Sequence, residues 1–203
     1  MHIRHNYRFR EVLTWLSRIT HCRGFGVQSP SAYRFIRYVV NEHYPYYAYD
    51  DLRKEFPDTG FIDEKLYKLY FRIANFLQPQ TFISIGKKDP LLHRYVKAGC
   101  RKTDILNFDS IWDFCCKTPD DIPTPILLRV NLYDESCDIP LSLIDNMPDN
   151  AIMILDGIKH NREARNTWKQ LRDDARTGVT FDLYYCGILF FDKRIKQNYI
   201  VNF

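Results

Sequence analysis

The sequence has 203 residues, of which 45% are hydrophobic and 15% aromatic, and its formal net charge is +4. This apolar content excludes a disordered chain, and the length fits one α/β domain with an appendage but no second full domain. No apolar run is long enough to span a bilayer, and the N-terminal stretch lacks the apolar core of a signal peptide, so we expect a cytoplasmic protein.

The N-terminal region is basic. Residues 1–40 carry seven arginines and a single acidic residue, Glu11. A solvated helix face, on which arginine stems cover apolar surface, accounts for this charge, and an arm that contacts RNA or lipid is the alternative. Apolar residues repeat at helical spacing between Tyr7 and Ile19. Ser29 and Pro30 then supply the cap and first turn of a second helix, which ends near Asn41.

We predict that residues 1–60 form a helical extension. It should bury Trp15, Leu16, Tyr33 and Phe35 against the main domain or against a second subunit, which makes a homodimer through the extension one expected arrangement. Residues 61–203 then form the main domain. Within it, residues 63–77 have helical spacing, and Asp89 followed by Pro90 indicates the start of another helix.

Short apolar runs follow from residue 81 onward: TFISIG, TDILNFD, PILLRVN, AIMILDG, VTFDLYY, ILFF and YIVNF. Runs without clean alternation are typical of strands covered on both faces, hence of a largely parallel sheet. Residues 181–203 leave no room for a crossover helix, so their strands should pair antiparallel. The predicted fold is α/β, a Rossmann-like three-layer sandwich with a mostly parallel sheet and antiparallel C-terminal strands.

Several segments, in order, resemble one bacterial O-methyltransferase-like group. GFGVQSPSAYRFI is similar to its HGVHSPF segment, AIMILDGIKHNREARNTWKQLRDD to its VLVFDDIHW strand and following helix, and VTFDLYYCGILFFDK to its closing strands. The resemblance implies the fold of the class I S-adenosylmethionine-dependent methyltransferases. It also implies S-adenosylmethionine as the cofactor.

The cofactor motif of that family is altered here. Its first strand ends in a pattern like EIGTSLGIST, whose glutamate falls on Ser84, whose first glycine falls on Gly86 and whose second falls on Pro90. The resemblance implies that the missing acid and glycine weaken contact with the cofactor. Lys87 and Lys88 beside a helix N-terminus favour an anion over a sulfonium, although two solvated lysines in a turn are the alternative.

Three further positions are candidates for the cofactor site. Asp109 lies 23 residues after Gly86, where Rossmann-like sites place a carboxylate on the ribose hydroxyls, or it simply closes its strand. The family's FIDGNH pattern corresponds to LLRVNL, which puts Arg129 where the resemblance implies a carboxylate. Asn131 matches the family's asparagine.

The candidate catalytic residues follow the run AIMILD. Asp156 survives where metal-dependent relatives carry paired aspartates, but Gly157 takes the next position, and one carboxylate does not make a divalent metal site. His160 is a candidate general base for a hydroxyl substrate, with an ordinary surface histidine as the alternative. The six cysteines include no CxxC pair, so we predict no metal site.

Two hypotheses follow for the function. The chain is either a divergent S-adenosylmethionine-dependent O-methyltransferase or a non-catalytic binding or scaffold protein that keeps the fold. We expect S-adenosylmethionine to bind weakly or not at all, and we expect neither nucleic acid nor membrane as a partner. The substrate, a small molecule or a protein, stays open. The short interval from Asp109 to Ile126 also predicts that one strand and one helix of the usual sheet are reduced or missing.

Overall fold

The structure is a computed structural model, and it describes residues 13–21, 26–117, 122–133, 139, 142–145 and 147–203. The helices are the 3-10 helix η1 (Ile19–His21), α2 (Pro30–Phe35), the π-helix η2 (Ile36–Val40), α3 (Tyr47–Glu55), α4 (Phe61–Leu77), α5 (Pro90–Gly99), α6 (Ile111–Lys117), α7 (Ser142–Asp145) and α8 (Arg162–Asp173). The strands are β1 (Thr81–Ile85), β2 (Asp104–Phe108), β3 (Ile126–Asn131), β4 (Ile152–Asp156), β5 (Val179–Asp182), β6 (Cys186–Phe190) and β7 (Gln197–Ile200).

The strands form one sheet in the order β2-β1-β3-β4-β6-β5-β7. Strands β2, β1, β3 and β4 pair in parallel, and β6 is antiparallel to both of its neighbours, β4 and β5. The predicted parallel sheet with antiparallel C-terminal strands is therefore confirmed. Strand β7 differs from the expectation, because it pairs with β5 in parallel. Since β6 lies between β4 and β5, the free edge of β5 is the place left for the last strand.

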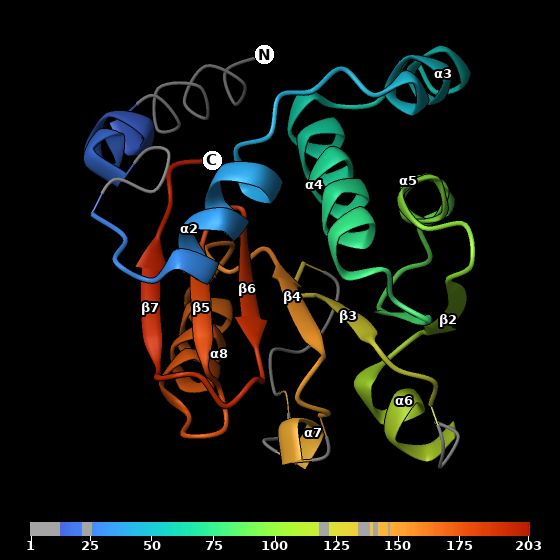
Figure 1. The fold of residues 1–203 in the computed structure, drawn as a ribbon. Helices are drawn as coiled ribbons and strands as arrows, with labels where there is room; N and C mark the ends of the chain where they lie inside the picture. The colour runs from blue at the N-terminus through green and yellow to red at the C-terminus, as the bar shows by residue number, and fades with distance from the viewer. Residues whose placement is uncertain (1–12, 22–25, 118–121, 134–138, 140–141, 146) are drawn as a thin grey trace.

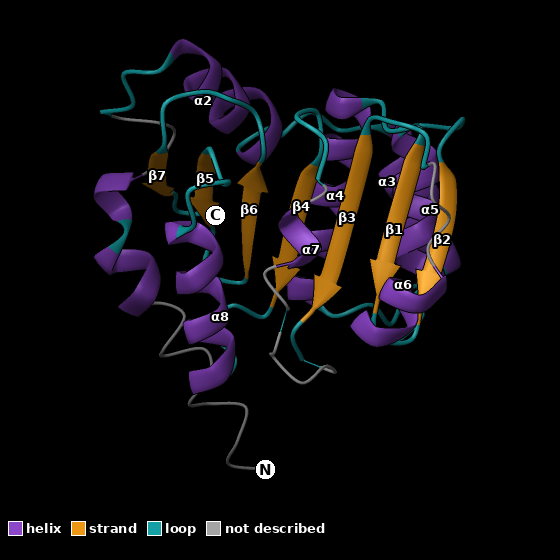
Figure 2. Ribbon diagram, turned by 90° about the horizontal axis from the view of Figure 1, so that it is seen from below, coloured by secondary structure: helices purple, strands orange, loops and turns teal. Residues whose placement is uncertain are grey.

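Helices cover both faces of the sheet (Figures 1 and 2). Helices α2, η2, α4 and α5 lie on one face, with α3 outside them, and α6, α7 and α8 lie on the other. The strands β1, β3 and β4 are buried along their whole length, whereas the edge strands β2 and β7 are partly exposed. The architecture is the predicted three-layer sandwich, and each face of the sheet has its own apolar core.

Local sequence signals account for three helix starts. The Oγ of Ser29 accepts a hydrogen bond from the backbone of Ala32 at 3.4 Å, and Asp89 accepts one from the N–H of Leu92 at 3.0 Å. A proline follows each of these caps, as expected for a first helical turn. Helix α8 begins in the same way at Asn161, which caps the third N–H that follows it.

Part of the N-terminal region is built into the core. Phe35 is 3% exposed and packs with the rings of Phe181 and Phe190 at 5.0 Å each. Trp15, Leu16 and Tyr33 are 50%, 50% and 42% exposed in the single chain, so the expected burial against the main domain is wrong for them, whereas burial against a second subunit stays a prediction. The period of an amphipathic helix shows which residues share a face, but it does not show how deeply that face is buried. The domain boundary between residues 60 and 61 stays a prediction.

An ion pair fixes the N-terminal segment to the C-terminal part of the sheet. The Nη2 of Arg18 lies 2.9 Å from the carboxylate of Asp182, and Lys159 approaches the other oxygen of that carboxylate at 2.8 Å. The guanidinium of Arg18 also lies 5.4 Å from the ring centroid of Tyr184. These contacts connect segments far apart in the sequence. The arginines at positions 4, 8, 10 and 23 lie outside the described residues.

The interval between β2 and β3 keeps its helix. The sequence predicts that the helix here is reduced or missing; α6 occupies residues 111–117, so the helix is present, with a length of seven residues. Residues 109–117 and 122–125, which are the described part of this interval, contain no strand, and β2 is the edge of the sheet. Among the described residues, no helix is both long and apolar enough to cross a membrane.

Candidate functional site at the carboxyl ends of the parallel strands

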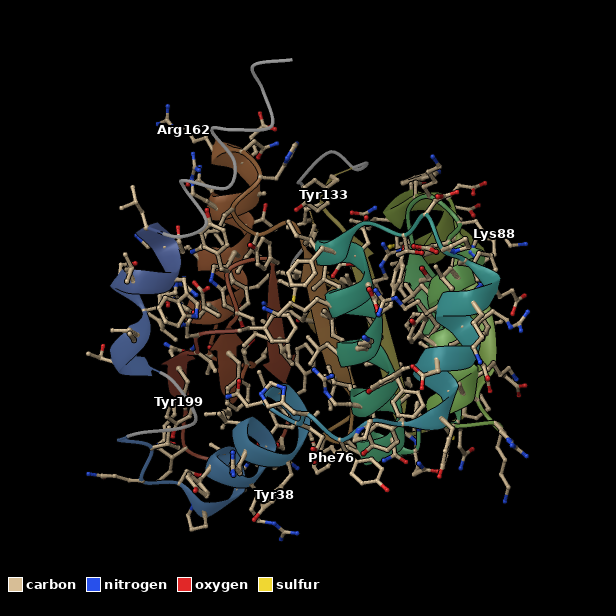
Figure 3. The ribbon with its side chains drawn as sticks, turned by 90° about the horizontal axis from the view of Figure 1, so that it is seen from above. Tyr38, Phe76, Lys88, Tyr133, Arg162 and Tyr199 are labelled. Carbon is tan, nitrogen blue, oxygen red and sulfur yellow. The ribbon has the colours of Figure 1, made fainter. Side chains whose placement is uncertain are left out.

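The polar residues selected from the sequence gather at one end of the sheet. The strands β1, β3 and β4 are parallel, so their last residues, Ile85, Asn131 and Asp156, lie at the same edge. Figure 3 shows Lys88 and Tyr133, which follow β1 and β3, at the end of the molecule opposite Phe76. Open α/β sheets bind their ligands at this carboxyl edge.

A buried polar cluster lies beneath α4 at this edge. The Nε of Arg129 is 2.7 Å from Oδ2 of Asp156, and its Nη1 donates to the Oγ of Ser84 at 3.2 Å. The hydroxyl of Tyr70, from α4, donates to Oδ1 of Asp156 at 3.0 Å. All four side chains belong to residues that are at most 6% exposed. We call Ser84, Arg129, Asp156 and Tyr70 the polar cluster.

The sheet register explains how the polar cluster forms. Ser84 and Arg129 are direct partners in the ladder between β1 and β3, and Asn131 is the partner of Asp156 in the next ladder. Side chains two residues apart on a strand point to the same face, so Arg129 shares its face with Asn131. The long guanidinium side chain therefore extends along that face toward the strand ends and reaches Asp156.

The charges within the polar cluster hold each other in place. Burial alone would lower the pKa of Arg129, but the carboxylate of Asp156, together with Tyr70 and Asp89, raises the pKa above its ordinary value. Burial, with a further contribution from Asp156, raises the pKa of Tyr70 well above its usual range. Arg129 is therefore charged and Tyr70 is neutral at physiological pH. The cluster satisfies its own charges without any ligand.

The turn between β1 and α5 is closed by internal hydrogen bonds. Gly86 has a φ of +106° and its N–H donates to the carbonyl of Phe108 at 2.9 Å. One carboxylate oxygen of Asp89 caps α5, and the other accepts a hydrogen bond from the hydroxyl of Tyr67 at 2.7 Å. Lys87 and its neighbour Lys88 are both exposed. The anion-binding hypothesis for these two lysines stays a prediction.

Two acidic groups of α4, the carboxyl of Asp63 and the phenol of Tyr67, lie near this turn. Asp63, in the first turn of α4, is exposed, but partial loss of hydration, followed by the negative charges of Asp89 and Asp156, raises its pKa. Burial also raises the pKa of the Tyr67 hydroxyl, and its hydrogen bond to Asp89 adds to this effect. The end of α4 thus brings a carboxylate and a phenol to the carboxyl edge. No sequence motif marked either residue as part of the site.

The remaining cofactor candidates lie at different depths. Asp109, directly after β2, is exposed, so its carboxylate faces solvent at the position where the resemblance implies contact with ribose hydroxyls. Asn131 is 8% exposed, and its Oδ1 accepts a hydrogen bond from the N–H of Tyr133 at 3.1 Å. Of these two residues, only Asp109 is exposed, and its contact with a cofactor stays a prediction.

The candidate catalytic residues are separated by a tight turn after β4. Asp156 is held in the polar cluster, whereas His160 is exposed and its ring lies 4.7 Å from that of Tyr133 in an edge-to-face arrangement. Gly157 adopts a φ of +81°, and a Cβ there would lie 2.9 Å from the ring of Tyr133. The positive φ favours glycine at this position, and a Cβ there would also require the half-exposed ring of Tyr133 to shift.

The site thus joins some predicted residues and leaves others apart. Arg129 and Asp156 were selected separately, and the structure brings them into one ion pair. Arg129, which stands where the resemblance implies a carboxylate, is thus paired with the carboxylate of the next strand. Sequence reasoning missed Tyr70, which reads as one of the apolar positions of α4. Among the described residues, no three His, Cys, Asp or Glu side chains cluster as metal ligands would.

These residues do not fit S-adenosylmethionine as the resemblance would require. The cofactor's ammonium and sulfonium groups call for acids near the end of β1. That position is Ser84, which is fully buried and accepts a hydrogen bond from Arg129. The nearby Asp156 is already engaged by Arg129 and Tyr70. Asp109 alone matches the expected chemistry.

A comparison of the sequence with family models finds no match, and a comparison with curated proteins finds none. Several solved structures are similar in fold. The methyltransferase PaMTH1 of Podospora anserina, determined with SAH, is 15% identical, with 82% of this chain and 97% of that chain covered and a TM-score of 0.48. Cofactor-bound Rv0187 from MTB is 10% identical, with 71% and 86% covered and a TM-score of 0.48.

The O-methyltransferase TomG of Streptomyces achromogenes, determined with SAM, is 11% identical, with 73% of this chain and 91% of that chain covered and a TM-score of 0.47. The fold class of this chain rests on its own sheet. A parallel sheet whose C-terminal strand β6 is inserted antiparallel between β4 and β5 is the arrangement of the class I S-adenosylmethionine-dependent methyltransferases.

Proposed function

We propose that this chain is a methyltransferase-like protein with a degenerate cofactor site, which acts by binding a partner or ligand and not by transferring a methyl group. The observation that carries this proposal is the buried ion pair between Arg129 and Asp156, whose Nε and Oδ2 atoms are 2.7 Å apart. The pair takes up the carboxylate at the end of β4 and covers Ser84 at the end of β1.

The free energy needed to separate Arg129 from Asp156 supports weak binding of S-adenosylmethionine. A ligand that needs Asp156 must first separate it from Arg129, and disrupting a buried ion pair costs about 3–5 kcal/mol. Each 1.4 kcal/mol changes a dissociation constant about tenfold, so a micromolar affinity would move to the millimolar range. The exposed lysines after β1 add positive charge beside the same position, which further disfavours a sulfonium.

An active but divergent O-methyltransferase is the second candidate, and one observation favours it. Asp109 presents an exposed carboxylate at the end of β2, and the exposed His160 lies at the same carboxyl edge, where a hydroxyl substrate would need a base. In this case Asp109 would hold the ribose hydroxyls, and His160 would take the proton of the acceptor.

Thermal unfolding with and without cofactor tests the proposal. A ligand present at about 100 times its dissociation constant stabilises a protein by about 2.7 kcal/mol, which raises the Tm of a chain of this size by several degrees. We expect no Tm change with about 0.1 mM S-adenosylmethionine or its demethylated product, S-adenosylhomocysteine. A rise of about 5 °C with either compound would favour the active enzyme.

A further inference from the structure

Strand β2 is one edge of the sheet, and its outer side has no neighbouring strand among the described residues (Figure 2). On its inner side, the N–H of Asp104 donates to the carbonyl of Gln80, and the carbonyl of Phe108 accepts a hydrogen bond from the turn after β1. Backbone groups of successive strand residues point to opposite sides, so Ile105 and Asn107 present their N–H and C=O groups outward. Outside the ladder with β1, these groups have no hydrogen bond to a described residue. The outer side of β2 is thus open to a further strand.

Strand β2 lacks the usual devices that protect an exposed sheet edge. It contains no proline and no lysine, and all 5 of its residues pair in unbroken register with β1. Natural edge strands commonly carry such residues or a bulge, which prevent pairing with a further strand. Of the residues of β2, Asp104 alone is charged, and it stands at the first position. The sequence of β2 therefore does not block edge pairing.

Both apolar cores of the protein end at β2 with a side chain that is only partly buried. Ile105 packs against the core on the α4 side of the sheet, and Leu106 packs against the core on the α8 side. Neither side chain is fully covered by the chain itself. A strand that paired with the outer side of β2 would cover apolar surface on both faces of the sheet, which favours association.

Charges of opposite sign flank the two ends of β2. Arg101 and Lys102 precede the strand and form its basic end, and Asp109 follows it directly and forms its acidic end. All three residues are exposed, and none has an ion-pair partner among the described residues. In an antiparallel pair of two copies, the basic end of each β2 lies beside the acidic end of the other. The charge pattern is therefore complementary to itself under twofold symmetry.

Neighbouring charges do not remove this pattern. At the basic end, Asp104 is also exposed, but the two cations outnumber it. At the acidic end, the exposed lysines 87 and 88 follow β1 and not β2, so they lie one strand farther from an added strand, a spacing of about 4.8 Å. Asp109 is thus the charge nearest to the open side at that end of β2.

We propose that two copies of this chain form a dimer through β2, in antiparallel register centred on Leu106. In this register Ile105 of each copy lies opposite Asn107 of the other, so the outward N–H and C=O groups of both residues are paired. The partly exposed side chains of Leu106 meet at the twofold axis, and each basic end lies beside an acidic end. This dimer is independent of whether the carboxyl edge binds S-adenosylmethionine.

Sedimentation equilibrium of the full chain without cofactor tests the dimer. We expect a reversible dimer with a dissociation constant below about 100 μM, as is usual for a small interface. Asn107→Pro removes an outward N–H and leaves the ladder with β1 intact, since an edge strand tolerates proline at such a position. This variant should dimerise at least about tenfold more weakly than the wild type.

Opposite charge reversals test the register. Arg101→Glu combined with Lys102→Glu makes both ends of β2 acidic, and Asp109→Lys makes both ends basic. Each of these two proteins should dimerise at least about fivefold more weakly than the wild type, because like charges then meet across the interface. An equimolar mixture should form a heterodimer more tightly than either protein forms its own dimer. Lys169→Glu, on the distant helix α8, should leave dimerisation unchanged.

Two results would overturn the dimer through β2. One is a wild-type chain that stays monomeric up to about 0.5 mM. The other is a dimer whose two charge variants do not prefer each other in the mixture, which would place the interface elsewhere. A Tm measurement confirms that each variant is folded, and if Asn107→Pro is not, the charge variants decide, because their side chains are exposed. Titration with S-adenosylmethionine reports on the proposed function separately.

Discussion

Arg129 and Ser84 are direct neighbours in the sheet, and the guanidinium Nη1 of Arg129 donates to the hydroxyl of Ser84 at 3.2 Å. Ser84 stands where the resembling family carries an acid. The arginine therefore covers this position and at the same time neutralises Asp156 at 2.7 Å. The change at the end of β1 and the change in β3 act together, because each completes the contacts of the other.

Removing one partner of the ion pair in the polar cluster should strongly destabilise the protein. Arg129→Met leaves the carboxylate of Asp156 buried without its cation, which should lower the free energy of unfolding by about 3–5 kcal/mol. Denaturant unfolding measures this change. Arg94→Met is the matched control, because Arg94 pairs with Glu55 on the surface, and its loss should cost no more than about 1 kcal/mol.

The double variant Arg129→Met with Asp156→Asn separates the loss of an ion pair from a general loss of packing. It removes both charges, so part of the stability lost in Arg129→Met should return. If the double variant is as unstable as the sum of the two single variants, the two side chains do not act as a pair.

Asp182 should make stability depend on pH in the acid range. Burial alone would raise the pKa of Asp182, but its contacts with Lys159 and Arg18 lower the pKa below its usual value. A carboxyl group with a lowered folded-state pKa stabilises the protein above its unfolded pKa of about 3.9, and this contribution disappears as the pH falls through the folded-state pKa. The difference in free energy of unfolding between wild type and Asp182→Asn should thus be constant from pH 7 to about pH 5 and decrease below about pH 4.

Urea unfolding at a series of pH values measures this difference. In the Arg18→Gln background, the loss of stability caused by Asp182→Asn should be smaller at neutral pH, because one of the two cations that lower the pKa of Asp182 is missing. A difference between wild type and Asp182→Asn that grows as the pH falls would contradict the assignment.

The N-terminal extension should stabilise the protein through α2. Phe35→Ala removes a ring that is 3% exposed and should lower the free energy of unfolding by about 3–5 kcal/mol. Tyr33→Ala, two positions away in the same helix, removes a ring that is 42% exposed and should cost less than about 1 kcal/mol. Equal and small losses in both variants would mean that α2 is not part of the core in solution.

Gly157 lies in the turn after β4, and Gly26, which precedes α2, is a matched control for it. Both have a positive φ, of +81° and +79°, but only at Gly157 would a Cβ collide with a ring, that of Tyr133. Gly26→Ala should cost about 1–2 kcal/mol from the backbone conformation alone. Gly157→Ala should cost more, and combining it with Tyr133→Ala should remove the excess. Equal losses of stability in both glycine variants would show that the ring does not pack on this turn.

Local signals made much of the fold predictable. The pairs Ser29–Pro30 and Asp89–Pro90 indicated two helix starts that the structure confirms. The apolar runs indicated buried parallel strands, because residues covered on both faces do not alternate. The pairing of β7 with β5 was not predictable, since it depends on the position of β6 within the sheet and not on the residues of β7.

The candidate site, like the fold, was predictable only in part. The sequence marked Arg129 as a charge reversal and Asp156 as a surviving carboxylate, but not their contact, which depends on the register of two strands 27 positions apart. A buried arginine needs a counter-charge, and this requirement is the signal that could have joined them. Tyr70 gave no such signal, because a tyrosine at an apolar helix position satisfies the helical pattern whether or not its hydroxyl has a partner.

The affinity of the wild-type protein for S-adenosylmethionine tests the central claim most directly. Isothermal titration should give no measurable binding at about 0.1 mM cofactor, or a dissociation constant close to millimolar, because Arg129 and Asp156 satisfy each other. The same result is expected for S-adenosylhomocysteine. A dissociation constant near or below about 10 μM for either compound would contradict the account and would make Asp109 and His160 the first residues to substitute.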